Sequence, residues 1–181
     1  MLIDGYCTVG GPSDPEPPAA VLIAAMDRAE VDRAVVAPPD RGFAWENEWA
    51  ADLTAAAASA YPGRFIPVVT ANPWRPDAWA VVEQYYEPGH SLLALAPGVQ
   101  GFNPCEGLLD PLLERIERHF GQVPVYIHTG HHSYGAPAQL ALLAERFASL
   151  VFIMGHSGST DYAGDVVAVC RKHTNIYPES S

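Results

Sequence analysis

Two short apolar stretches, each ending in a histidine and a glycine, decide the fold: Val123-Pro-Val-Tyr-Ile-His128-Thr-Gly130 and Val151-Phe-Ile-Met-Gly-His156-Ser-Gly158. An apolar stretch of this length, bounded by glycine, is typical of a strand buried on both faces. Parallel α/β folds bind their ligands at the carboxyl ends of such strands. We therefore expect His128 and His156 to share a site, where two imidazoles can bind a metal or transfer protons.

The rest of the chain alternates short apolar segments with longer amphipathic ones. Strands are predicted at 2–6, 33–37, 65–70, 98–102, 124–128, 151–154 and 175–177. Helices are predicted at 19–30, 45–61, 77–86, 110–120, 137–148 and 164–172. A helix between each pair of strands is the repeat of an α/β fold whose parallel strands are joined by right-handed crossovers.

Seven such strands favour a TIM barrel over a doubly wound sheet, and no GxGxxG or P-loop motif opens a helix. A TIM barrel has eight strands and about 250 residues, whereas this sequence has 181 residues and reaches a seventh strand. We expect a single domain, residues 1–181, that forms an incomplete or open barrel without its eighth strand. An open edge favours a homo-oligomer. A complete but smaller α/β sheet is the alternative.

The composition limits the kinds of binding partner and the cellular compartment that we expect. The formal net charge of −11 argues against nucleic acid and anionic membranes as partners. The three cysteines, Cys7, Cys105 and Cys170, form neither a disulfide framework nor a zinc-finger spacing. No apolar segment approaches the ~18 residues of a membrane span. We expect a cytoplasmic protein that binds a small molecule.

Several segments, in order, resemble the amidohydrolase-related family, the TIM-barrel branch of metal-dependent hydrolases and decarboxylases. The matching segments are Met26–Pro38, Tyr61-Pro-Gly-Arg-Phe65, Gly98-Val-Gln-Gly-Phe-Asn-Pro104, Pro124–Gly130 (PxxxHxG), Gly155-His-Ser-Gly158 (GHxG) and Asn175–Ser180. The resemblance implies hydrolysis of a C–N or C–O bond, or decarboxylation of a small carboxylic acid. It also implies a divalent metal such as zinc, with His128 and His156 among its ligands.

The first strand departs from the family pattern. The family usually carries Asp-x-His-x-His there, and the two histidines bind the metal, but this sequence reads Asp4-Gly-Tyr6-Cys-Thr8. Alternate residues of a strand point to the same side, so we expect Tyr6 and Thr8 to face the site and Cys7 to face a helix. The aspartate that the family takes from its eighth strand is also missing. Two histidines fall short of the three protein ligands of a typical catalytic zinc site.

His128, His156 and Tyr6 are the predicted catalytic residues, and the two histidines are also the candidate metal ligands. For each histidine the alternative is a buried side chain that is hydrogen-bonded inside the barrel. Asn72, Asn103 and His131 are predicted to contact the substrate. Both asparagines fit the role of turn residues equally well. His131 and His132 could supply a third imidazole from the loop after the fifth strand, but two solvated loop histidines are the better explanation.

Three functions remain open. The first is an amidohydrolase-like enzyme in which a metal activates water against a small carboxylic acid, ester, lactone or amide at the mouth of the barrel. The second is a metal-free, lactonase-like enzyme, in which Tyr6 orients a substrate carboxylate and His128 polarises a carbonyl. The third is a degenerate or truncated barrel without catalysis.

Overall fold

The computed structural model describes residues 1–130 and 133–181. Within these residues, seven strands form one parallel sheet whose spatial order follows the sequence. The strands are β1 (Ile3–Thr8), β2 (Arg33–Ala37), β3 (Phe65–Val69), β4 (Leu92–Leu95), β5 (Pro124–His128), β6 (Val151–Gly155) and β7 (Ile176–Pro178).

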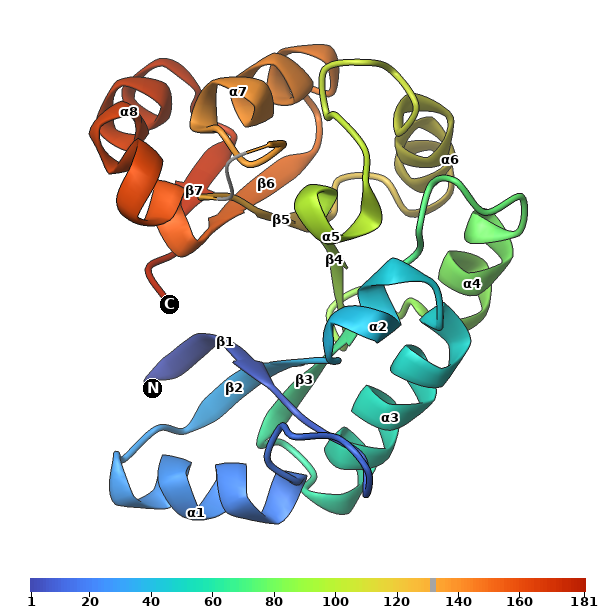
Figure 1. The fold of residues 1–181 in the computed structure, drawn as a ribbon, viewed down its shortest axis with the longest axis vertical. Helices are drawn as coiled ribbons and strands as arrows, with labels where there is room; N and C mark the ends of the chain where they lie inside the picture. Colours follow the sequence, from blue (N-terminus) through green and yellow to red (C-terminus); the bar gives the residue numbers. More distant parts are fainter. Residues whose placement is uncertain (131–132) are drawn as a thin grey trace.

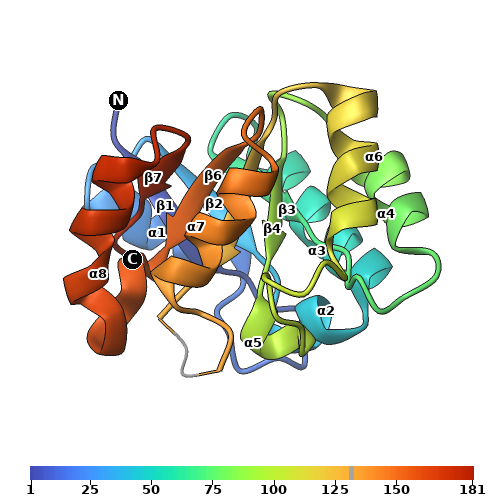
Figure 2. The same ribbon diagram turned by 90° about the horizontal axis from the view of Figure 1, so that it is seen from above.

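Helices connect successive strands, and the longer ones cover the outer face of the curled sheet (Figure 1). They are α1 (Ala19–Arg28), α2 (Asp40–Ala44), α3 (Asn47–Ala60), α4 (Ala78–Tyr85), α5 (Pro97–Gln100), α6 (Asp110–Phe120), α7 (Pro137–Arg146) and α8 (Ser159–Lys172), with a 3₁₀ helix, η1 (His156–Gly158). Figure 2 shows the strands from above with the helices around them. None of the described helices combines the length and the apolar character that a membrane crossing needs.

The sheet is an open, incomplete (β/α) barrel, as predicted. β1 and β7 form its two edges, and in the described residues these strands do not pair with each other. The sheet curls so far that the two edges, and with them the two ends of the chain, face each other (Figure 1). Since all strands are parallel, their carboxyl ends lie at one end of this half-barrel.

The predicted fourth strand at 98–102 is wrong. The strand is β4, Leu92–Leu95, which pairs with β3 and β5 in the middle of the sheet. All four of its residues are buried, as a central strand with helices outside it requires. Pro97 in the first turn then begins the short helix α5, and Gly101 ends it in the left-handed conformation at φ 71°. The glycines of the expected strand are therefore helix and turn residues.

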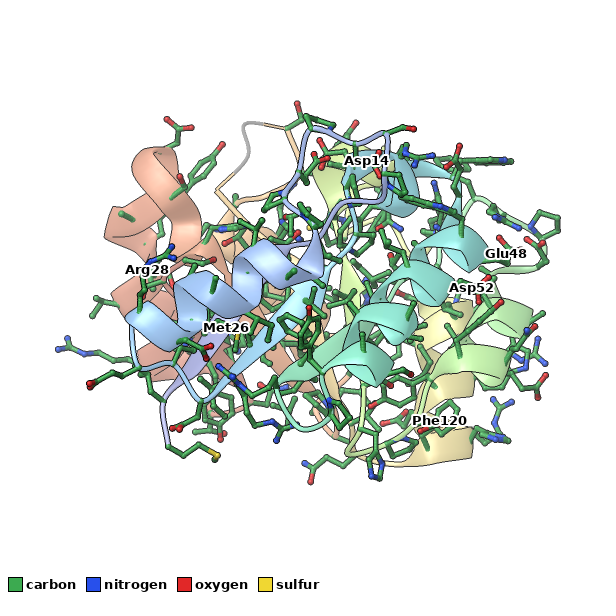
Figure 3. All side chains as sticks on the ribbon, turned by 90° about the horizontal axis from the view of Figure 1, so that it is seen from below. Asp14, Met26, Arg28, Glu48, Asp52 and Phe120 are labelled. Carbon is green, nitrogen blue, oxygen red and sulfur yellow. The ribbon has the colours of Figure 1, made fainter. Side chains whose placement is uncertain are left out.

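The core has an inner and an outer part. Inside the curl, small residues near the carboxyl ends of the strands make room for buried rings; this inner cluster contains Val35, Ala37, Phe43, Val68, Leu92, Ala94, Ala96 and Tyr126. Outside, the sheet packs against the helices in two further clusters. Met26 of α1, labelled in Figure 3, belongs to the outer cluster over the first strands.

Gly155, at the end of β6, leaves the space that the Tyr126 ring occupies. A Cβ at position 155 would lie 2.2 Å from Tyr126 Cζ, and Tyr126 is fully buried. Gly155→Ala should therefore lower the free energy of unfolding by about 1–3 kcal/mol in urea denaturation, because the ring must move. Gly164→Ala is the control, since no atom lies within 4 Å of its added Cβ. It should raise stability by up to ~1 kcal/mol through helix propensity. Equal effects of the two substitutions would contradict the steric role of Gly155.

Candidate functional site

The structure brings the two histidines together at the carboxyl ends of β5 and β6. His128 is the last residue of β5 and pairs in register with Gly155, so His156 directly follows the end of the neighbouring strand. The two rings lie 4.8 Å apart between centroids, and His128 Nδ1 lies 3.0 Å from His156 Nε2. One imidazole therefore donates a hydrogen bond to the other.

Tyr6 completes this group from the first strand. Its ring lies 4.8 Å from the His128 ring and 5.3 Å from the His156 ring, and it stacks on Tyr126 at 5.4 Å. Burial raises the pKa of Tyr6, so the phenol keeps its proton. Cys7 lies on the other face of the strand, where it packs in the cluster beneath α1 and donates to the main-chain oxygen of Val35. Tyr6 and Cys7 thus point to opposite faces of β1, as predicted.

His128 is an uncharged base at neutral pH. Burial, and then the proximity of His156, lower the pKa of His128 to about 3. Phe43 of α2 packs against the ring at 5.2 Å between centroids. The Nε2 atom of His128 is buried and has no hydrogen-bond partner among the described residues. A buried polar atom without a partner is uncommon and often marks the place of a ligand or a catalytic role.

The hydrogen-bond partners of His156 assign the protons of both rings. His156 Nδ1 lies 3.1 Å from the main-chain oxygen of Ser181, which can only accept, so Nδ1 donates. A neutral imidazole has one N–H, and His156 Nε2 must therefore accept from His128 Nδ1. As a result, Nε2 of His128 carries an unshared electron pair.

The backbone beside the pair is strained. Residues 156–159 have φ values of 57°, 34°, 74° and 44°, four consecutive residues in the left-handed region that L-amino acids avoid. Hydrogen bonds hold this segment: Ser157 Oγ donates to the main-chain oxygen of Glu179, and Gly158 N donates to Thr129 Oγ1. Strain of this kind is concentrated at active and ligand-binding sites.

A pocket of about 210 Å³ opens beside the histidines. Its walls come from the ends of β4, β5 and β6, from α5 and from the start of α8; the lining residues are Ala96, Gly98, Val99, His128, Thr129, Gly130, His156 and Ser159. No carboxylate stands among these lining residues, and most of the wall is apolar. Such a pocket suits a small organic molecule.

The two asparagines predicted to contact substrate are engaged in the protein itself. Asn72 follows β3 but is buried, and its side chain bonds to the main chain of Ala44 and Trp74. Asn103 does not follow a strand, because the fourth strand ends eight residues earlier at Leu95. Its side chain bonds to Glu106, Gln139 and the main chain of Cys105. His131 lies outside the described residues, as does His132.

Sequence reasoning missed Glu179, a carboxylate that bonds to the main chain of His156. Glu179 directly follows β7, and its Oε2 accepts hydrogen bonds from Tyr126 Oη at 2.9 Å and from His156 N at 3.3 Å. The signal was present in Pro178-Glu-Ser at the end of the seventh predicted strand. An acid at a strand end lies at the same edge of the sheet as the two histidines.

The donors that the described residues offer do not fit a metal site. Among the described residues, no three His, Cys, Asp or Glu side chains stand where they could hold one ion. The first strand offers the phenol of Tyr6 and the hydroxyl of Thr8, which are poor ligands beside imidazole or carboxylate. The facing nitrogens of His128 and His156 are used in their mutual hydrogen bond. The chemistry derived below therefore uses the side chains alone.

The buried neutral state of His128 makes stability depend on pH. The folded pKa of about 3 lies below the ~6.5 of an unfolded histidine, so the unfolded chain binds more protons between these values. Stability is complete above about pH 6.5 and falls as the pH drops. Urea denaturation should show a loss of about 2 kcal/mol from this group between pH 7 and pH 5. His128→Asn should remove that part of the slope, and His119→Asn, at an exposed position of α6, should keep it. Parallel slopes in both variants would mean that His128 is not buried neutral.

Comparison with known proteins places this fold. Residues 10–181 match the model of the amidohydrolase family. The search of curated proteins gave no match. Similar solved structures include an amidohydrolase II (TM-score 0.71, 12% identity, covering 98% of this chain and 78% of that one). They also include the 5-carboxyvanillate decarboxylase of Novosphingobium aromaticivorans, solved with manganese and 4-hydroxy-3-methoxy-5-nitrobenzoic acid (TM-score 0.69, 16% identity, covering 96% of this chain and 70% of that one).

A third similar structure is a probable 2-pyrone-4,6-dicarboxylic acid hydrolase from Acinetobacter baumannii, with citric acid bound (TM-score 0.59, 15% identity, covering 99% of this chain and 70% of that one). At these identities the structural likeness concerns the fold alone. The family match, in contrast, covers nearly the whole sequence. The chain belongs to the amidohydrolase family, and it has the fold of that family's hydrolases and decarboxylases of small acids.

Proposed function

We propose that this chain is an enzyme that acts on a small carboxylic acid and hydrolyses an ester or lactone bond in it. The observation that carries the proposal is the buried Nε2 atom of His128, which has no hydrogen-bond partner among the described residues and belongs to a side chain that lines the pocket. A water molecule or substrate hydroxyl that donates to this atom satisfies it. The neighbouring imidazole accepts the proton on the other side of the ring.

The reaction needs one proton transfer in each direction. His128 Nε2 takes a proton from water, and the water oxygen forms a bond to the carbonyl carbon of the ester or lactone. The tetrahedral intermediate then breaks its C–O bond to the leaving oxygen, which receives the proton back from Nε2. Tyr6, whose ring packs against both imidazoles, is assigned the task of orienting the substrate carboxylate through its protonated hydroxyl.

The carboxylate of the proposed substrate is supported by two observations. The lining of the pocket contains imidazoles and hydroxyls but no acidic side chain, so an anion meets no like charge there. Two structures with this fold hold carboxylic acids, a substituted benzoic acid in one and citric acid in the other. Decarboxylation is the second candidate, since one of these relatives by fold is a decarboxylase.

Substitution of the two histidines tests the site. The purified protein should be screened against lactones, esters and amides that carry a carboxylate, with CO₂ release from aromatic acids followed in parallel. His128→Asn and His156→Asn should each lower kcat/KM by at least about 100-fold, the usual value of a general base. His119→Asn, on the outer face of α6, is the matched control and should retain full activity. Retention of activity by both site variants would show that the reaction occurs elsewhere.

Removal of metal ions tests separately whether the reaction needs a metal. Because the described side chains provide no complete set of ligands, turnover should survive exhaustive chelation, and added zinc or manganese should not raise it. The measurement is kcat/KM before and after chelation, together with the metal content of the purified protein. Loss of turnover on chelation, restored by one equivalent of zinc, would instead establish the metal-dependent mechanism of the family.

A further inference from the structure

We propose that Glu179 is a positioning residue of this site: through Ser181 and His156 it fixes which nitrogen of His128 is basic and stabilises the charge that forms when His128 takes a proton. The proposal rests on the function proposed above for His128. It extends the site to Glu179, which directly follows β7 and accepts the last of a continuous series of hydrogen bonds that begins at His128.

Glu179 is bonded on both carboxylate oxygens. Oε1 accepts from Ser181 N at 2.6 Å, and Oε2 accepts from Ser181 Oγ at 2.9 Å. Oε2 also accepts from Tyr126 Oη at 2.9 Å and from the main-chain nitrogen of His156 at 3.3 Å. Ser181 is thus held in place by Glu179, and both atoms that accept from His156 Nδ1 belong to Ser181.

The hydrogen bonds from His128 to Glu179 all run in the same direction, each group donating toward Glu179. A carboxylate only accepts, so the single hydroxyl proton of Ser181 goes to Glu179, and Ser181 Oγ accepts from His156 Nδ1 at 3.0 Å. His156 Nε2 then accepts from His128 Nδ1 at 3.0 Å. Without Glu179, Ser181 is released, its hydroxyl can donate to His156 instead, and the opposite tautomer of His128 becomes accessible.

The same series of hydrogen bonds explains how a buried imidazole can act as a base. Burial opposes a positive charge on His128. When Nε2 of His128 takes a proton from water, its Nδ1 proton moves to Nε2 of His156. His128 stays neutral, and the charge appears on His156, one hydroxyl away from the Glu179 carboxylate. Tyr6 and Tyr126, which also contact His156, stay protonated because burial raises the pKa of both. The reverse movement returns the proton to the leaving group.

Glu179 also bridges the two edges of the open barrel. A Cβ built on Gly5 of β1 would lie 2.6 Å from Glu179 Cγ, so the side chain packs directly on the backbone of the opposite edge strand. The residue at position 5 therefore controls where this carboxylate stands. Gly5→Ala should displace the flexible Glu179 side chain without altering its charge, which provides a second variant for the test.

The test uses long-range ¹⁵N–¹H NMR of the full chain labelled with ¹⁵N-histidine, at a pH where the imidazoles are neutral. In the wild-type protein, His128 should show a protonated Nδ1 and an unprotonated Nε2. Glu179→Gln and Gly5→Ala should each convert this single tautomer into a mixture and lower kcat by about 10- to 100-fold, with a smaller change in KM. Glu145→Gln removes a carboxylate that pairs with Lys172 on the outer helices and should change neither readout.

The outcomes separate the two proposals. A protonated Nε2 on His128 in the wild-type protein, or an unchanged tautomer in both Glu179→Gln and Gly5→Ala, would overturn the role of Glu179 even if His128→Asn abolishes turnover. A tautomer that changes in both variants supports the role of Glu179, including in a protein for which the substrate panel finds no turnover, where the proposed hydrolysis alone would fail. Should Glu179→Gln not fold, the Gly5→Ala result decides in the same way.

Discussion

The 3.0 Å hydrogen bond between His128 Nδ1 and His156 Nε2 joins the carboxyl ends of two neighbouring strands, and the chemistry of the site follows from it. Parallel pairing of β5 with β6 brings the rings together. Together with the contact of His156 Nδ1 with Ser181, the bond sets the tautomer of each ring and leaves one nitrogen of His128 free. It also uses the two nitrogens that face each other, which is one reason why the familiar metal chemistry of the family does not fit the described side chains of this chain.

Much of the surrounding structure supports that contact. Gly155 leaves space for the buried Tyr126 ring, and the Tyr126 hydroxyl reaches Glu179. The left-handed segment 156–159 is held by the side chain of Thr129, which follows β5, and by the main-chain oxygen of Glu179, which follows β7. In the place of the family's first-strand histidines, Tyr6 packs its ring against both imidazoles. In the described part of the chain, aromatic rings therefore surround the two histidines.

The sequence predicted the open barrel, the pairing of the two histidines in space and the orientation of Tyr6, because each depends on local rules: buried apolar strands, parallel order and alternation. It misplaced the fourth strand, since Leu92–Leu95 carries no glycine boundary, whereas the Gly98–Phe102 segment does and belongs to a short helix and turn. The error with Asn103 followed from that misplacement. Glu179 was missed because its importance depends on contacts with Tyr126 and Gly5, two residues that are distant from it in the sequence.

In the proposed mechanism, His128 acts as a neutral base and no metal takes part. The most direct measurement is a crystal structure grown with zinc and a small carboxylic acid, with anomalous scattering recorded at the zinc edge. The account predicts the acid, or a water beside it, with an oxygen about 2.6–3.2 Å from His128 Nε2, and no anomalous peak at the histidines. A zinc peak bonded to both His128 and His156 would contradict the account and restore the metal-dependent mechanism.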